Sequence, residues 1–539
     1  MIVATPGPLA LRGALLALLG AAASACDRSA PSPDAPTGVA RVTAASPASP
    51  RDSAPARSEP PTHGLATGDV DGESAVLWTR CAGEGRARFR VEAERAAPRD
   101  LDAPTPAARD HIAKVTVTGL SPGTRYDVLG WCEPAAPDAA VAPADPASSP
   151  PASAARAAFR TAPRDDRPAA VRFAWSGDLG GQNVCRDATR GYPIFEHLRG
   201  ESLDFFLALG DMIYADNSCL ARGALGNAQV PRGVSQAATL AGFREAWRYN
   251  REDPGYRALL SSASTYAVWD DHEVVNDFGP EEATRSAPPY QAGVSLLPAG
   301  RQALLDWNPI REDAADPTRL YRARRWGRHV ELLMLDTRQY RDRESAPDLA
   351  ERPKTLLGEA QRRWLRERLA QPAPTWTLVA SSVPIAVRTG HETKPLPDGW
   401  ASGDTDRGYE RELAALFREL RDAGRRGLVF LTTDVHFAAV YRHRPLRDDA
   451  SFVVHELVVG PLSAGLFPRR EFDRTFGTER LFFHGPARWE DIRTFDAIVP
   501  WLSFGEIEVS AEGELVARIR DGAGRVVDER RLEQGRSGE

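Results

Sequence analysis

The clearest pattern in the chain is a set of short apolar runs beyond about residue 165, each of which stops at an acidic residue. Runs of this length predict buried β-strands, and the amphipathic segments between them, such as 357–370 and 409–424, predict helices. Alternating strands and helices are typical of layered α/β proteins. We therefore expect an α/β domain over residues 166–530. The runs span 171–178, 205–214, 265–273, 331–340 and 428–440.

Residues 63–165 show a different pattern, in which short β-prone runs are separated by turn signals. Such a pattern predicts a small all-β sandwich ahead of the α/β domain. The segment "GLSPGTRYDV" (119–128) resembles a fibronectin type III or immunoglobulin-like domain. This resemblance implies that Tyr126 makes the corner hydrogen bond found in such domains.

The N-terminal segment predicts export. Arg12 precedes an apolar stretch from Gly13 to Ala25, which is shorter than the ~20 residues that a membrane-spanning helix needs and fits a secretory signal over residues 1–26. The sequence Ala-Ser-Ala-Cys ending at Cys26 resembles a lipoprotein cleavage site with Cys26 lipidated. Ordinary signal-peptidase cleavage after Ala25 is the alternative. Residues 27–62, rich in Ala, Pro and Ser, predict a disordered linker.

Composition and charge limit the classes of partner. A chain of 539 residues is too long for one ordinary domain, and 42% hydrophobic with 26% charged residues is typical of a globular enzyme. The net charge of −6 leaves no surplus of Lys and Arg to neutralise phosphates. We therefore expect nucleic acid to be at most a substrate and not a binding partner. We also expect the protein to be a monomer and to contact the membrane only through lipid on Cys26. The predicted location is the periplasm or cell envelope.

The chain has five cysteines. If Cys26 carries lipid, four remain, and an even number in an exported protein favours disulfides. The simplest pairs are Cys81 with Cys132 and Cys185 with Cys219. A metal-bound thiolate is the alternative for Cys185.

Several polar side chains are expected to meet where the strands end, because ligands in α/β folds collect beyond the carboxyl ends of strands. A single acid at a strand end is more often a helix N-cap or a turn residue, and His272 or Tyr214 alone fits an ordinary buried position. Together, so many carboxylates require cations. Oxygen ligands with one or two imidazoles suit Fe, Mn, Ca or Mg. The residues are Asp178, Asp211, Asp270, Asp271, Asp336 and Asp434, with Tyr214, His272, Asn276 and His436.

The ordered motifs "SGD", "LGDMIYAD", "WDDHEVVND", "LDTRQYR" and "TTDVHFAAV" resemble the alkaline phosphatase D family. That family belongs to the metallophosphoesterases and is related in active-site plan to purple acid phosphatases. The resemblance covers about residues 63–510. It implies a metallophosphoesterase-type layered α/β sandwich behind the small β domain.

The resemblance also implies roles for residues of the first three motifs. Asp178 matches the first metal ligand, where many relatives have a cysteine. Asp211 would bridge two ions, and Tyr214 would offer a phenolate to ferric iron. Asp271 stands where the wider group has an asparagine, and His272 is the neighbouring acid–base histidine.

The remaining roles are implied in the same way. Asn276 would be a further calcium ligand, and Asp434 with His436 would form the last ligand pair. A histidine-bearing motif of the purple acid phosphatases is absent from "LVASSVPIAV" (378–387), which favours Ca²⁺ over zinc beside Fe³⁺; other divalent metals also fit. Arg338 would either hold the substrate phosphate or pair with a neighbouring acid.

These expectations describe an exported metal-dependent phosphoesterase that hydrolyses phosphate monoesters, diesters or both. Two ions about 3.5–4 Å apart would polarise the phosphoryl oxygens and supply a hydroxide, and His272 would protonate the leaving group. A phospholipase or teichoic-acid-type phosphodiesterase is one alternative, favoured if the linker holds the site near lipid. An inactive envelope-binding lipoprotein is another, although such a protein would not need Asp211.

Overall fold

The computed structural model describes residues 58–135, 150–199, 202–279, 293–389, 398–402 and 407–534. The predicted signal 1–26, including Cys26, and most of the predicted linker 27–62 lie outside the described residues, so both stay predictions. Within the described ranges, none of the helices has the length and apolar character needed to cross a membrane.

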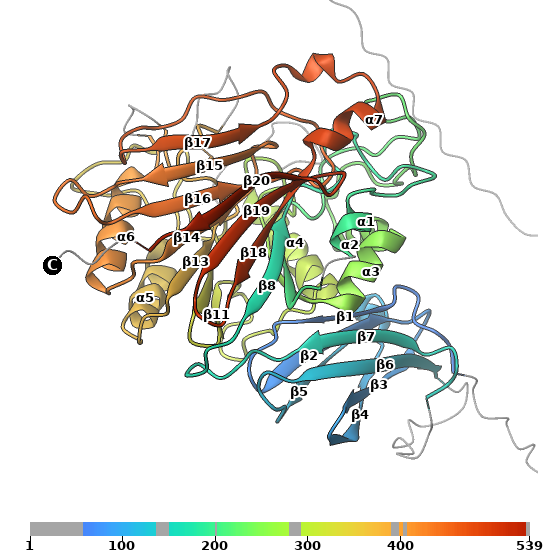
Figure 1. Cartoon of the computed structure of the whole chain (residues 1–539). Helices are drawn as coiled ribbons and strands as arrows, with labels where there is room; N and C mark the ends of the chain where they lie inside the picture. The colour runs from blue at the N-terminus through green and yellow to red at the C-terminus, as the bar shows by residue number, and fades with distance from the viewer. Residues whose placement is uncertain are drawn as a thin grey trace, which may run out of the picture. The chain divides into compact units, whose positions relative to one another are not determined.

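The apolar runs form strands of two large sheets (Figure 1). The first sheet has nine strands, and β8, β9 and β10 lie side by side and parallel within it. Parallel neighbours have their carboxyl ends at the same edge of a sheet, so the residues that follow these strands converge. In sheet order the strands are β20 (Val526–Leu532), β19 (Leu515–Asp521), β18 (Ser503–Val509), β8 (Val171–Ser176), β9 (Phe205–Leu209), β10 (Ser264–Val268), β1 (Leu65–Gly68), β2 (Ser74–Arg80) and β5 (Ile112–Thr118).

The second sheet has seven strands, of which β12, β13, β14 and β16 are parallel. Two further strands, β15 and β17, pair antiparallel at one edge, and β11 pairs antiparallel at the other. In sheet order the strands are β11 (Arg322–Trp326), β12 (Val330–Met334), β13 (Trp376–Ala380), β14 (Leu428–Thr432), β16 (Val454–Val458), β15 (Ala438–His443) and β17 (Glu479–His484).

One apolar core is built from both large sheets. Trp175 and Leu207 of the nine-stranded sheet belong to the same buried cluster as Leu332 and Leu378 of the seven-stranded sheet. Successive side chains of a strand point to opposite faces, and the alternate residues Phe206 and Ala208 of β9 accordingly pack in a different cluster. The burial of both faces explains why these strands are almost continuously apolar.

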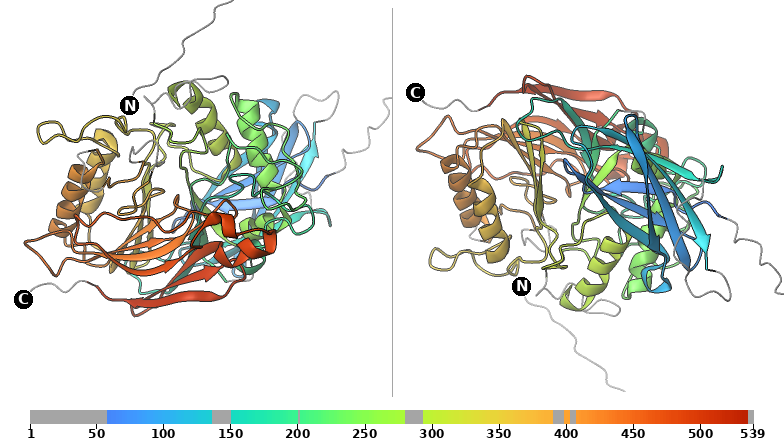
Figure 2. Two further views of the ribbon diagram at one scale, coloured as in Figure 1. Left: turned by 90° about the horizontal axis from the view of Figure 1, so that it is seen from above. Right: turned by 90° about the horizontal axis from the view of Figure 1, so that it is seen from below.

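Helices supply the partners for those other faces (Figure 2). The cluster on the nine-stranded sheet contains residues of α1, α2, α3, α4 and α7, and the cluster on the seven-stranded sheet contains residues of α5 and α6. The structure is therefore a sheet-rich mixture of strands and helices. The helices are α1 (Phe195–Leu198), α2 (Leu240–Arg251), α3 (Pro254–Ser262), α4 (Gly293–Trp307), α5 (Gly358–Leu369), α6 (Glu410–Asp422) and α7 (Phe495–Ile498), with 3₁₀ turns η1 (Ala107–Arg109), η2 (Trp489–Asp491) and η3 (Val499–Trp501).

The N-terminal strands form two facing sets around a core of their own. One set is a four-stranded sheet in the order β4 (Ala96–Pro104), β3 (Gly85–Ala93), β6 (Arg125–Pro134) and β7 (Ala155–Arg160). The hydroxyl of Tyr126 accepts a hydrogen bond from the backbone amide of Ser121 at 2.8 Å, which is the expected corner bond. A disulfide joins Cys81 to Cys132 within this core.

The other N-terminal set differs from the expected separate sandwich, because β1, β2 and β5 belong to the nine-stranded sheet. Strand β1 pairs in parallel with β10, with Gly68 opposite Thr265. An added Cβ at Gly68 would lie 2.5 Å from the carbonyl oxygen of Thr265, so the close approach of the two strands requires glycine. The predicted boundary near residue 165 stays a prediction.

Candidate metal centre

The loops that follow parallel strands carry the acids of the site. Asp178 follows β8, Asp211 follows β9 and Asp271 follows β10, whereas Asp434 follows β14 of the other sheet. The hydroxyl of Thr433 donates to the backbone carbonyl at the end of β9 at 3.0 Å. The edges of the two sheets therefore meet at this point and bring the four acids together.

The backbone at these acids is unusual. Asp178, Asp211, Asp434 and His436 have φ angles of 62°, 52°, 77° and 53°. Residues other than glycine rarely adopt this left-handed region, in which Asp and His are enriched, and such strain clusters at functional sites. A helix N-cap has an extended backbone instead, so helix capping does not explain these residues.

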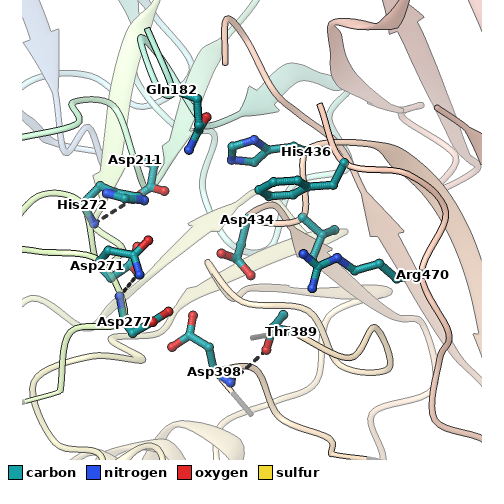
Figure 3. A pocket seen from close by; sticks show the side chains of 13 residues that line it. Gln182, Asp211, Asp271, His272, Asp277, Thr389, Asp398, Asp434, His436 and Arg470 are labelled. Atoms are coloured by element: carbon teal, nitrogen blue, oxygen red, sulfur yellow. Dashed lines mark hydrogen bonds between the residues drawn. The ribbon is translucent and has the colours of Figure 1, made fainter. Parts of the chain in front are cut away.

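A cavity of about 180 Å³ opens between the loops (Figure 3). Figure 3 shows the carboxylates of Asp271 and Asp434 on opposite sides of it. Of the predicted metal ligands, Asp178 and Tyr214 are buried and do not line the cavity. The lining residues are Gln182, Asp211, Asp271, His272, Asn276, Asp277, Thr389, Asp398, Asp434, Val435, His436, Phe467 and Arg470.

Two overlapping groups of side chains offer metal ligands. Ligand atoms of Asp211, Asp271 and His272 all lie within 4.8 Å of one another. The same holds for Asp271 with Asp277 and Asp398. Oxygen-rich groups of this kind suit hard cations such as calcium or magnesium.

A third group lies next to the cavity wall. The Tyr214 hydroxyl is 2.9 Å from His436 Nε2, and Asp178 Oδ1 is 3.5 Å from the same nitrogen. His436 Nδ1 bonds to the carbonyl of Gly465, which orients Nε2 toward the phenol and the carboxylate. Burial lowers the pKa of His436 to about 3, so the ring is neutral and can serve as a ligand.

The positive charge of the described residues compensates the buried carboxylates only in part, through Arg338 beside Asp270 and Asp271. Burial, reinforced by Asp270, raises the pKa of Asp178 well above its usual range, and burial with Asp271 does the same for Asp211. Burial and Asp398 likewise raise the pKa of Asp434. Among the described residues, both carboxylate oxygens of Asp178 and one each of Asp270 and Asp271 have no hydrogen-bond partner. Unpaired buried oxygens with elevated pKa values are what a site for hard cations requires.

Asp216, which the sequence patterns did not single out, orients the histidine of the site. Its Oδ1 is 2.6 Å from His272 Nδ1, and its Oδ2 accepts the backbone amide of Asn276 at 3.0 Å. Burial alone would lower the pKa of His272, but Asp216 and Asp271 outweigh burial and raise it to about 10. The position of Asp216 in the motif "LGDMIYAD", two residues after Tyr214, was the available signal.

Glu273 was also missed, although it follows His272 in the motif "WDDHE". Its carboxylate accepts the backbone amides of Asp211 at 3.0 Å, Met212 at 2.8 Å and Asp270 at 2.8 Å. Glu273 thus fastens the loop after β9 to the loop after β10. It holds ligand-bearing backbone in place from behind the cavity, which it does not line.

Arg338 is fully buried and does not line the cavity. Its Nε donates to Asp270 Oδ1, and its two terminal nitrogens bind both oxygens of Asp398, one at 2.8 Å. Of the two expected roles, this arrangement corresponds to the ion pair with neighbouring acids. The carboxylate of Asp336 is also engaged in hydrogen bonds, because its Oδ1 accepts one from Trp269 Nε1 at 3.0 Å and one from the backbone amide of Arg338 at 3.1 Å.

A second disulfide joins Cys185 to Cys219 near the site. The two residues form a small buried cluster with Tyr249. Both sulfurs are therefore bonded to each other, and the arrangement offers no thiolate at Cys185.

Comparison with known proteins identifies the class. Residues 173–500 match the PhoD-like phosphatase domain, and residues 44–127 match the N-terminal domain of PhoD-like phosphatases. Because the first match alone covers more than half of the sequence, the chain belongs to the PhoD-like phosphatase family.

The chain is also similar to individual proteins of known name or structure. Alkaline phosphatase D of Bacillus subtilis (strain 168) is 27% identical over 265 residues, which are 47% of this chain and 44% of that protein, so the match spans less than half of the relative. A solved structure of PhoD is similar in fold, with a TM-score of 0.66 and 20% identity over 88% of this chain and 94% of that chain. The purple acid phosphatase PPD1 of yellow lupin (Lupinus luteus) seeds has a TM-score of 0.53 and 12% identity, over 87% and 74%.

Asp211 belongs to the first ligand group together with Asp271, which is also a member of the second, so we expect its charge to be shared by bound ions. Asp211→Asn keeps the shape but removes this charge, so purified protein should lose at least one bound ion, measured by elemental analysis. Asp336→Asn is the matched control, because this strand-end acid is saturated by hydrogen bonds away from the cavity. Unchanged metal content in Asp211→Asn would show that Asp211 serves only to accept the His272 amide, at 3.1 Å.

Proposed function

We propose that the chain is a metal-dependent phosphoesterase that hydrolyses phosphate monoesters, diesters or both. The observation that carries the proposal is the cavity between the two sheets, where the carboxylates of Asp211, Asp271 and Asp434 lie with His272, a histidine oriented by Asp216. Membership of the PhoD-like phosphatase family and the likeness to alkaline phosphatase D support it. We assign the activity to residues 166–530, preceded by the β domain of 63–165.

The residues present fit bound cations. The unpaired oxygens of Asp178 and Asp271 and the raised pKa values of Asp178, Asp211 and Asp434 indicate sites that positive charge would stabilise. When bound, such ions would act as Lewis acids that polarise phosphoryl oxygens and lower the pKa of water. The residues that would hold them are Asp178, Asp211, Tyr214, Asp271, Asn276, Asp434 and His436.

We further propose Fe³⁺ and Ca²⁺ as the ions, with other divalent metals as the alternative. Ferric iron would be held on the side of Asp178, Tyr214 and His436, where a phenol and an imidazole are 2.9 Å apart. Calcium would be held on the side of Asp271 and Asn276, which offers oxygen ligands. Family resemblance supports this division, since the carboxylates themselves suit several hard cations.

Asp216 and His272 together position a proton at the cavity. Asp216 holds His272 through Nδ1, which leaves Nε2 as the ring nitrogen for a ligand in the cavity. Ester hydrolysis breaks the bond between phosphorus and the leaving-group oxygen, which must gain a proton unless it is a stable anion. A histidine placed on the cavity wall can donate that proton, and Asp216 stabilises the charged ring before the transfer.

We also propose that the protein is exported, with Cys26 as its first mature residue. The disulfides Cys81–Cys132 and Cys185–Cys219 support an oxidising compartment. The intact mass of mature protein from a bacterial host should correspond to a chain that starts at Cys26, with added lipid mass if Cys26 is the anchor. A chain that still carries residues 1–25 would contradict export.

The iron assignment predicts a coloured protein. A phenolate on ferric iron gives a visible charge-transfer band, which Tyr214→Phe should remove. Tyr192→Phe is the matched control, because Tyr192 is equally buried but bonds to Asn250 at 2.7 Å, away from the cavity. Absorption spectra and iron content check the prediction, and a colourless, iron-free protein with full activity would contradict it.

The acid role of His272 predicts a dependence on the leaving group. His272→Ala should slow hydrolysis of an alkyl phosphate such as glycerol phosphate by about 10²–10⁴-fold. Nitrophenyl phosphate should be much less affected, because nitrophenolate leaves without a proton. Asp216→Asn should act in the same direction but less strongly, since it only misorients the ring.

The competing explanation is that His272 merely packs beside Asp271 and orients it. In that case, rates for both substrates should fall by the same factor and metal should be lost. Steady-state rates for both substrates, measured together with metal content, separate these outcomes.

A further inference from the structure

We propose that Arg470 binds an unesterified phosphate oxygen and makes the site favour phosphate monoesters over diesters; this inference rests on the proposed phosphoesterase function. Within the described ranges, Arg470 is the one arginine or lysine that lines the cavity. Figure 3 shows its guanidinium directed into the cavity, across from Asp271 and His272. An anionic substrate bound among the metal ligands would therefore meet this cation on the far side.

The guanidinium is positioned through a stack of rings. Arg470 Cζ lies 5.0 Å from the centre of the Phe467 ring, a cation–π contact. Phe467 in turn stacks on His436, with ring centres 4.5 Å apart and an interplanar angle of 16°. His436 is held in place by hydrogen bonds to Gly465 and Tyr214. The stack therefore fixes the position of Arg470 with respect to the candidate metal ligands.

Both ends of the segment that carries Arg470 are attached to the site. Near its start, the amide of Ser463 donates to the carbonyl of Asp178 at 3.0 Å. Near its end, the amide of Asp473 donates to the carbonyl of Ala386 at 2.8 Å. The segment therefore bridges the loop after β8 and the chain that follows β13, which limits the positions that Arg470 can take.

The chemistry of phosphate esters gives this cation a selective effect. A monoester has three unesterified oxygens, whereas a diester has two. Cations held by the acids would take two of these oxygens, so only a monoester would retain a third for Arg470. The guanidinium suits this oxygen because it is always charged and carries several N–H donors in a fixed plane.

The test compares Arg470→Gln with the wild type in the metal-loaded, full-length protein. A hydrogen bond to a charged group contributes enough that its loss should weaken binding of inorganic phosphate roughly ten- to hundredfold, measured by calorimetry. The KM for a monoester should rise by a similar factor with kcat changed less, while diester hydrolysis and metal content stay close to wild type. Arg470→Lys, which keeps charge but not the planar fork, should give an intermediate loss.

Two further variants separate positioning from charge. Phe467→Leu removes the ring under the guanidinium and should weaken phosphate binding a few-fold. Arg469→Gln is the matched control, because this neighbouring arginine is exposed and does not line the cavity. Arg469→Gln should leave phosphate binding and both activities unchanged.

The outcomes distinguish this inference from the proposed function. Equal losses on monoester and diester in Arg470→Gln, or no loss on either, would overturn the role of Arg470 while leaving the phosphoesterase intact. A wild type that hydrolyses only diesters would do the same. A change in metal content without a change in phosphate affinity would make Arg470 a counter-ion to the acids. A metal-loaded wild type that neither binds phosphate nor hydrolyses any ester would overturn the proposed function, and this inference with it.

Discussion

Negative charge buried at the carboxyl ends of strands is the constraint on which the rest of the structure depends. Burial and mutual repulsion raise the pKa values of Asp178, Asp211 and Asp434, because a carboxylate away from water is costly unless positive charge is near. The chain supplies some of that charge through Arg338, which binds Asp270 and Asp398. The residues that the structure describes do not supply the remainder, and a hard cation is the simplest way to complete the balance.

The fold holds these charges together by joining loops rather than by burying each acid separately. Glu273 accepts three backbone amides from the loops after β9 and β10, and Thr433 connects the loop after β14 to the end of β9. Left-handed backbone at Asp178, Asp211 and Asp434 would be unfavourable in isolation. The interlocking hydrogen bonds maintain it, and side chains held in this way keep their geometry when ligands bind and leave.

What could be predicted from the sequence depended on whether a residue acts through its place on a strand. Asp211 and Asp434 were predicted at the site because an acid that ends an apolar run lies at a sheet edge, and His272 was predicted because it follows two such acids directly. Asp216 and Glu273 lie within the same motifs, but their roles depend on the conformation of the loops that follow the strands, and the hydrophobic periodicity of a sequence does not predict loop conformation. The pairing of β1 with β10 was likewise hidden, because a strand pattern shows burial but not the neighbouring strand. The residues predicted at the site do lie together, but their metals and chemical roles stay proposals.

The two arginines of the site show how surroundings divide similar side chains between different tasks. Arg338 follows a core strand and is fully buried, where an unpaired guanidinium would be very unfavourable. Asp270 and Asp398 therefore occupy its donors, and it cannot bind substrate without breaking buried ion pairs. Arg470 instead lies half-buried at the cavity wall, where it packs over the ring of Phe467 and one terminal nitrogen donates to the exposed carbonyl of Arg388 at 3.5 Å. Arg338 thus compensates the charge of buried acids, whereas Arg470 is placed to contact a ligand. Arg470 can therefore be substituted without disrupting the buried ion pairs of the site.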